Sequence, residues 1–160
     1  MATYTVNVDV SQLQRVFGKA EEEAREYLEK KVARIVERLA KEVAQPIAQD
    51  NFGYGGAVTV TTEPIDHGYA IVAEGRAVCF LEFGAGVYSD THHPFIGRTP
   101  FTVKPGSWSE THARTWQHWV AAGKDPKDYP FNQQPTRGLY EAYRAVLQEI
   151  DRIAREELAE

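Results

Sequence analysis

The chain has 160 residues, enough for a single domain with its own core, and its hydrophobic content of 42% is ordinary for a soluble globular protein. Its net charge of −5 argues against a generally basic surface that would bind nucleic acid. The single cysteine, Cys79, excludes an intrachain disulfide and lies in an apolar run, as a buried and unreactive thiol would.

No apolar run approaches the roughly 20 residues that a membrane-spanning helix needs. The N-terminus also lacks the basic region followed by an apolar core that marks a secretory signal. We therefore expect no membrane association and one domain over residues 1–160. Its expected parts are a strand and a long helix in 1–50, a β-meander in 57–83, a long aromatic loop in 84–135 and a helix in 136–160.

The first third of the chain predicts a short strand and then helix. Residues 3–10 alternate polar and apolar, and Ser11 is placed to cap a short helical turn that Gly18 would end. A long helix is predicted over 19–49, and Pro46 should end or bend it near its last turn. Its narrow apolar stripe suits packing on a sheet or on a neighbouring subunit, and consists of Ala24, Leu28, Val32, Ile35, Leu39, Val43 and Ile47.

Three strands are predicted next, over 57–62, 69–73 and 77–83, as an antiparallel meander. The third is apolar on both faces, as expected of a strand that is covered on both sides. Glu82 interrupts it, and a carboxylate there must lie at the edge of burial or be paired. Gly84 and Gly86 then allow a turn that residues with side chains would resist.

The long segment that follows shows little periodicity, although a short helix is indicated over 109–122. It contains all three tryptophans, Trp108, Trp116 and Trp119. Because disordered segments are poor in aromatic residues, we expect it to order by packing on its own domain or on a neighbour. The tryptophans are equally consistent with a contact surface and with a small second core beneath the loop.

A closing helix is predicted over 136–158, with Thr136 as its N-cap. Its apolar face consists of Leu139, Tyr143, Val146, Ile150, Ile153 and Leu158. The expected fold class is therefore α+β: an antiparallel sheet of three to four strands packed against the long N-terminal helix and the C-terminal helix, with a long ordered loop.

The residues that could carry chemistry do not form a familiar pattern. His92, His93, His112 and His118, with Asp90 or Glu110, match neither the HExxH nor the Cys/His zinc spacing, and no GxSxG elbow is present. Glu82 could act as a general base, but we favour a structural carboxylate that caps backbone N–H groups of the Gly84–Gly86 turn or pairs with an arginine. We expect no catalytic residue, cofactor or metal.

The run Phe80-Leu-Glu-Phe-Gly-Ala-Gly86 resembles the Glu-Phe-Gly-(Thr/Ala)-Gly signature of a family of tailed-phage morphogenesis proteins. These are head–tail joining, neck or tail-completion proteins of siphophages and prophages, also described as minor capsid or tail components. The segments 105–109 and 135–142 resemble later parts of prophage members, and the order of elements agrees. Ala85 stands where members more often have threonine.

The resemblance implies a virion protein, assembled in the host cytoplasm, that forms a six-fold or twelve-fold ring. Its partners would be head-connector or neck proteins and tail tube or tail terminator proteins, with genomic DNA passing through the lumen without sequence-specific binding. An acidic balance suits such a conduit, because it repels phosphates. The candidate interaction and structural residues are Glu82, Phe83, Gly84, Gly86, Trp108, Trp116 and Trp119.

Two alternatives from other classes stay open. One is a monomeric module that binds a protein through the tryptophan loop. The other, less favoured, is a metal-dependent hydrolase or nuclease that uses Glu82, His92, His93 and His112.

Overall fold

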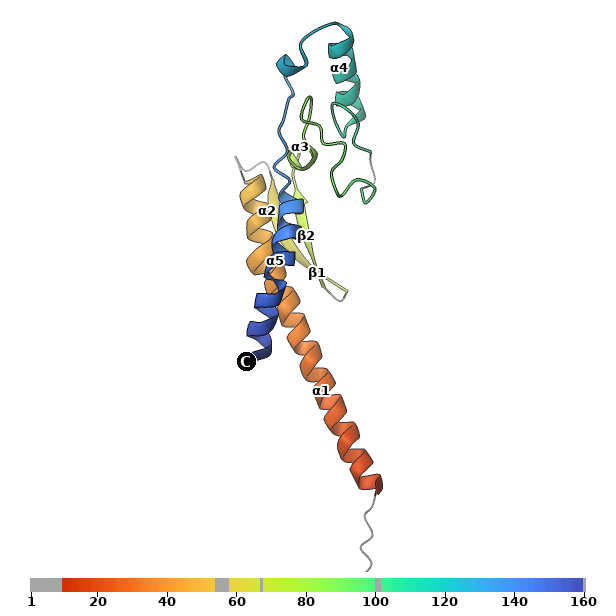
Figure 1. The fold of residues 1–160 in the computed structure, drawn as a ribbon, viewed down its shortest axis with the longest axis vertical. Helices are drawn as coiled ribbons and strands as arrows, with labels where there is room; N and C mark the ends of the chain where they lie inside the picture. The colour runs from red at the N-terminus through yellow and green to blue at the C-terminus, as the bar shows by residue number, and fades with distance from the viewer. Residues whose placement is uncertain (1–9, 54–57, 67, 100–101, 160) are drawn as a thin grey trace, which may run out of the picture.

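The computed structural model describes residues 10–53, 58–66, 68–99 and 102–159, with the backbone alone described for 10–17. The fold is α+β, with a long N-terminal helix, a two-stranded antiparallel hairpin and a C-terminal helix packed against the N-terminal one. Figure 1 shows an elongated molecule, with one helix projecting at one end and a lobe of loops around a short helix at the other. None of the helices described is long and apolar enough to cross a membrane.

The N-terminal helix is continuous but not uniform. It comprises α1 (Val10–Arg38), a π-helical turn η1 (Leu39–Ala44) and α2 (Gln45–Phe52). The widened turn comes directly before Pro46, which has no N–H to give, and the N–H of Gln45 reaches back five residues to the carbonyl of Ala40. The expected disturbance at Pro46 is therefore a π-helical turn, and helical structure continues beyond it to Phe52.

Two expectations at the start of the chain are affected by the length of α1. Gly18 lies inside α1 and does not end a helix, because the good helix formers that follow it offset its cost of about 1 kcal/mol. The strand predicted over 3–10 lies outside the described residues, apart from Val10, which begins α1.

The hairpin consists of β1 (Thr59–Ile65) and β2 (Gly68–Glu74), in a register that places Thr59 opposite Glu74. Both strands were predicted. Two glutamine side chains of α2 hydrogen-bond to the backbone of β1. Gln49 accepts from the N–H of Val60 (3.0 Å), and Gln45 donates to the carbonyl of Val60 (3.2 Å). These bonds join the hairpin to the helix beneath it.

The prediction of a third strand over 77–83 is wrong, and so is the expected sheet of three to four strands. In the part of the chain that the structure describes, the sheet has two strands, and Val78–Phe83 forms a short helix, α3. An unbroken apolar run has no period that separates strand from helix. As a helix it points Val78 and Leu81 at the main core, while Phe80 contacts Trp108 and His112 in the distal lobe.

The remaining elements are α4 (Glu110–Ala121), a 3₁₀ turn η2 (Pro126–Asp128) and α5 (Gly138–Ala159). The first confirms the short helix expected over 109–122. The last begins two residues after Thr136, which is not its N-cap, because the Thr136 hydroxyl donates instead to the carbonyl of Leu81 (3.3 Å). We refer to residues 84–137 as the distal lobe.

Two apolar clusters hold α5 in place. The larger joins α2 to the hairpin and to α5, with Phe52 and Ala142 among its fully covered members. Gly138 lets α5 approach α2, since a Cβ there would overlap the Phe52 ring. The smaller cluster packs Ile153 of α5 against Leu39 and Val43 of the π-helical turn.

Replacing Ile153 tests the second cluster. Its side chain is 0% exposed, so Ile153→Ala should lower the free energy of unfolding by about 2–5 kcal/mol, whereas Ile153→Val should cost only about 0.5–1.5 kcal/mol. Urea denaturation of the three proteins measures this. Equal stability of wild type and Ile153→Ala would contradict the packing described.

Candidate functional site

Glu82 is the centre of a buried polar site between α3 and α5. One carboxylate oxygen accepts from the N–H of Leu139 (2.9 Å) and the other from the N–H of Tyr140 (3.1 Å). The first N–H groups of a helix have no partner within the helix and carry the positive end of its dipole. Glu82 therefore caps α5. The sequence predicted that Glu82 caps backbone N–H groups, but it placed those groups in the Gly84–Gly86 turn and not at the start of α5.

His93 closes the site from the distal lobe. Its Nδ1 accepts from the N–H of Phe95 (3.1 Å), so in the neutral ring the proton lies on Nε2, which is 3.1 Å from a Glu82 oxygen. That approach lacks the direction of a hydrogen bond, and Nε2 makes none. The rings of Phe83 and Tyr140 pack edge-on against the imidazole and exclude water from it.

Burial acts in opposite directions on the two groups. It raises the pKa of Glu82, against the opposing effects of the two N–H donors and of Arg137. It lowers the pKa of His93 from its ordinary 6.5, partly offset by Asp90. Each shift disfavours the charged form of its own group. The imidazole of His93 is therefore favoured in its neutral form beside the carboxyl group of Glu82 that caps α5.

A second pair holds the chain just before α5. The Arg137 guanidinium donates to Asp90 at 2.7 Å, and the N–H of Asp90 donates to the carbonyl of Phe83 (2.8 Å). Arg137 has a φ of 53°, a left-handed conformation that few residues other than glycine adopt. The N–H groups of Thr136 and Arg137 both donate to the carbonyl of Leu81 (2.6 and 3.1 Å). The last turn of α3 and the start of α5 are thus fixed to one another.

Gly84 and Gly86 are required by the same geometry. Their φ angles are 71° and 65°, and a Cβ would overlap the carbonyl of Tyr88 at the first position and the Asn132 side chain at the second. Ala85 between them exchanges backbone hydrogen bonds with Gln133 (2.8 and 3.1 Å). The two glycines let the lobe fold back toward α5.

The three tryptophans pack within the distal lobe. Trp116 and Trp119 of α4 lie edge-on to Tyr129, with ring centroids 5.1 and 5.8 Å apart, and Trp108 lies edge-on to Phe80 at 5.5 Å. Tyr129 is buried. These ring contacts are those expected of a small second core in the lobe, although the three tryptophans remain partly exposed, and a contact surface formed by them stays a prediction.

The proposed metal ligands do not come together. His93 reaches Glu82, whereas His112 packs between Phe80 and Phe131 and His92 is exposed. Among the residues described, no three histidine, cysteine or acidic side chains are grouped closely enough to hold a metal ion.

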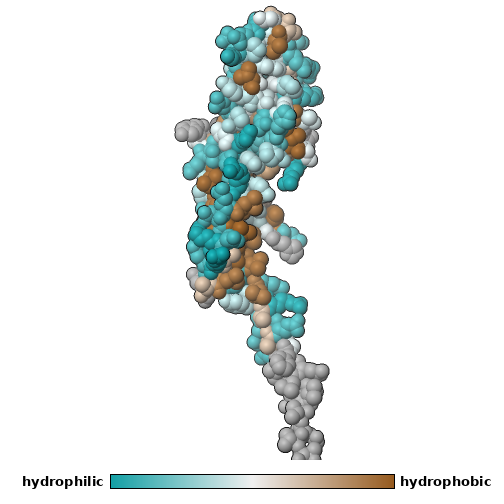
Figure 2. Space-filling model, viewed as in Figure 1, coloured by the Kyte–Doolittle hydropathy of each residue, from teal (hydrophilic) through white to brown (hydrophobic). Residues whose placement is uncertain are grey.

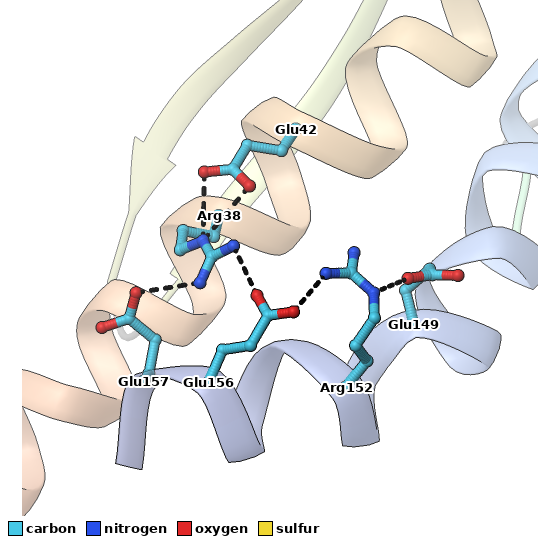
Figure 3. A network of polar contacts seen from close by, with 6 residues as sticks. All are labelled: Arg38, Glu42, Glu149, Arg152, Glu156 and Glu157. Atoms are coloured by element: carbon cyan, nitrogen blue, oxygen red, sulfur yellow. Dashed lines mark hydrogen bonds and ion pairs between the residues drawn. The ribbon is translucent and has the colours of Figure 1, made fainter. Parts of the chain in front are cut away.

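A network of ion pairs at the other end of α5 was not foreseen. Arg38 of α1 donates to Glu42 on its own helix and to Glu156 (2.9 Å) and Glu157 (3.1 Å) of α5, and Arg152 continues the network to Glu149 (Figure 3). Hydrogen bonds to Glu42, Glu156 and Glu157 hold the pKa of Arg38 well above its ordinary value. The network joins the end of α1 to the last turns of α5.

Beyond this network, α1 and the hairpin tip border an apolar groove of about 990 Å³. Leu28, Val32 and Ile65 are each more than half exposed there. Charged residues of α1 stand along it, among them Glu21, Glu29 and Glu37. We call it the α1 groove; its apolar lining includes Ala24, Leu28, Val32, Val36, Pro64, Ile65 and Tyr69.

The second uncovered surface is a ridge along α5. The sequence predicted one apolar face for α5, but the structure divides its apolar residues into two rows, one buried and one exposed. Leu139, Val146 and Ile153 pack inward, whereas the second row remains 42–56% exposed. Figure 2 shows hydrophobic residues gathered in a band beside α5 and toward the hairpin tip. We call the second row the α5 ridge; it consists of Tyr143, Leu147, Ile150 and Leu158.

The sequence held a signal for both surfaces. Apolar residues on α5 recur at two sets of helical positions, which is wider than one packed face requires. The stripe on α1 likewise extends well beyond the part that α5 can cover.

No protein-family model, curated protein or solved structure matches the chain.

Removing one acceptor oxygen tests the helix cap. Glu82→Gln should lower the free energy of unfolding by about 1–3 kcal/mol, because the amide NH₂ would face a backbone N–H and leave it without a partner. The exposed Glu63→Gln is the matched control and should change stability little. Urea titration measures both, and equal effects of the two substitutions would contradict the cap.

His93 predicts a dependence of stability on pH. Because its pKa is lowered in the folded state, its contribution is fully present above pH 6.5 and is lost as the pH falls toward the folded-state pKa, at up to about 1.4 kcal/mol per pH unit. The raised pKa of Glu82 has the opposite sign, since its contribution is present below pH 4.5 and is lost as the pH rises through the folded-state pKa.

The comparison of wild type with His93→Gln separates the two groups, since both proteins retain Glu82. Between pH 7.5 and pH 5.0, wild type should lose more stability than the variant in urea titrations. Parallel losses in the two proteins would show that His93 does not titrate in this way.

Proposed function

We propose that the chain is a structural morphogenesis protein of a tailed phage. In this proposal it assembles into a ring at the head–tail junction or completes the tail end, joins the tail to the head connector and lines the DNA path. The observation that carries the proposal is that a folded chain leaves two long apolar helix surfaces, the α1 groove and the α5 ridge, uncovered. Such patches on a soluble domain mark sites of protein association.

The residues of the phage-like signature also support a structural protein. Glu82 holds two backbone N–H groups of α5, Phe83 packs on His93, and Gly84 and Gly86 have conformations that exclude a Cβ. Each of these residues has a task in holding the fold together. A signature of this kind is what a family selected for assembly would carry.

The geometry favours this reading over the hydrolase. A general base needs a free oxygen in reach of substrate, yet both oxygens of Glu82 accept from α5 and the side chain is 1% exposed. A module that binds through its tryptophans is also less favoured, because Trp116 and Trp119 pack on Tyr129 within the lobe. The net charge of −5 supports a lumen through which DNA slides without sequence-specific binding.

The test is the mass in solution by light scattering over a concentration series, with negative-stain images of any large species. A six-fold or twelve-fold ring with a central hole is the expected result, either alone or on addition of a head-connector protein. A chain that stays monomeric at every concentration and does not bind the connector would contradict the proposal.

A further inference from the structure

We infer that the α5 ridge of one copy of this chain docks in the α1 groove of the next copy. The inference deepens the proposed function and rests on it, because it names the surfaces through which the ring would close. The partner is a second copy, since one chain carries two uncovered surfaces that match in shape, length and charge.

The shapes are complementary. The α1 groove is a hollow of about 990 Å³ between a helix and the tip of a hairpin, with an apolar lining. The α5 ridge is convex, and Tyr143, Leu147, Ile150 and Leu158 follow one another at helical spacings of four, three and eight. A row of side chains on one helix fills a groove beside another, as in the packing of helices within a core.

The lengths agree as well. The ridge runs from Tyr143 to Leu158, 15 positions further along, which is about 22 Å along a helix. The apolar lining on the α1 side of the groove runs from Ala24 to Val36, 12 positions further along, or about 18 Å. A ridge laid along the groove therefore covers most of both surfaces.

Charge at the edges favours the same pairing. Glu29 stands on the groove and Arg155 stands one helical turn before Leu158 on the ridge, and within the described residues neither makes an ion pair. The other acidic side chains on α1 beside the groove are already paired, Glu21 with Arg25 (3.7 Å) and Glu37 with Lys41 (2.6 Å), whereas Arg34, which also lines the groove, makes no ion pair within the described residues. Docking of the ridge gives Glu29 an opposite charge on the neighbouring copy.

The pairing joins two different surfaces, so each docked copy still presents one free ridge or one free groove. A contact of this head-to-tail kind propagates and forms a ring when its rotation closes. A contact between two grooves would instead leave the hollow unfilled.

The experiment uses two variants of the full chain. Leu147→Asp places a charge on the ridge, and Val32→Asp places one in the groove. Matched controls are Gln148→Asp, beside the ridge on the same helix, and Val120→Asp, at an exposed position of α4. All four positions are exposed, so folding should be retained, which circular dichroism checks.

Light scattering should show that each of the first two variants raises the dissociation constant of assembly at least about tenfold, while the controls match wild type. An equimolar mixture of the two variants should restore a complex of two chains and nothing larger, because Leu147→Asp keeps its groove and Val32→Asp keeps its ridge. Charge reversal gives a second readout: Glu29→Arg and Arg155→Glu should each weaken assembly and restore it when mixed.

Three results would overturn the inference. If wild type assembles and both aspartate variants assemble equally well, the contact is wrong while the ring proposal stands. If wild type is monomeric at the highest concentration it tolerates, the contact is also wrong, and the proposed function is then decided separately by binding to a head-connector protein. A mixture of the two variants that stays monomeric likewise counts against ridge-in-groove docking.

Discussion

The carboxylate of Glu82 at the start of α5 is the interaction on which the rest of the fold depends. It neutralises two backbone donors and the positive end of the helix, in a place closed to water by His93 and its aromatic neighbours. Because Leu81 also accepts from the residues that precede α5, this one junction fixes the short helix α3, the distal lobe and α5 together. An unpaired carboxylate in the same place would be costly, so the site requires all its partners at once.

With α5 fixed at its start, the surfaces that stay open follow from geometry. One face of α5 packs on α2, the hairpin and the π-helical turn, and no residue that the structure describes covers the adjacent face. At its far end α5 is joined to α1 by the ion pairs around Arg38, and the first turns of α1 project beyond the core (Figure 1). An isolated helix of this kind is marginal in water, because helix formation relies on tertiary packing of an apolar face. Assembly would supply that packing.

Sequence reasoning located the elements with clear periodicity and missed what depends on distant partners. The long helix, both hairpin strands, the short helix of the lobe and α5 were all predicted, because their patterns are local. The run 77–83 was predicted as a strand because an unbroken apolar stretch has no period to read. The cap role of Glu82 was anticipated, but its partner Leu139 lies 57 residues away and no local pattern points to it. The division of α5 into a buried and an open face was equally hidden, since apolar residues look alike until their neighbours are placed.

Hydrogen exchange at low and high protein concentration tests whether α1 and α5 keep open apolar faces that self-assembly covers. Amides in residues 18–32 should exchange rapidly in dilute protein and become protected when the protein is concentrated. Amides at the start of α5, held by Glu82, should be protected at both concentrations. Equal exchange of residues 18–32 in dilute and concentrated protein would contradict the covering of α1 by self-assembly.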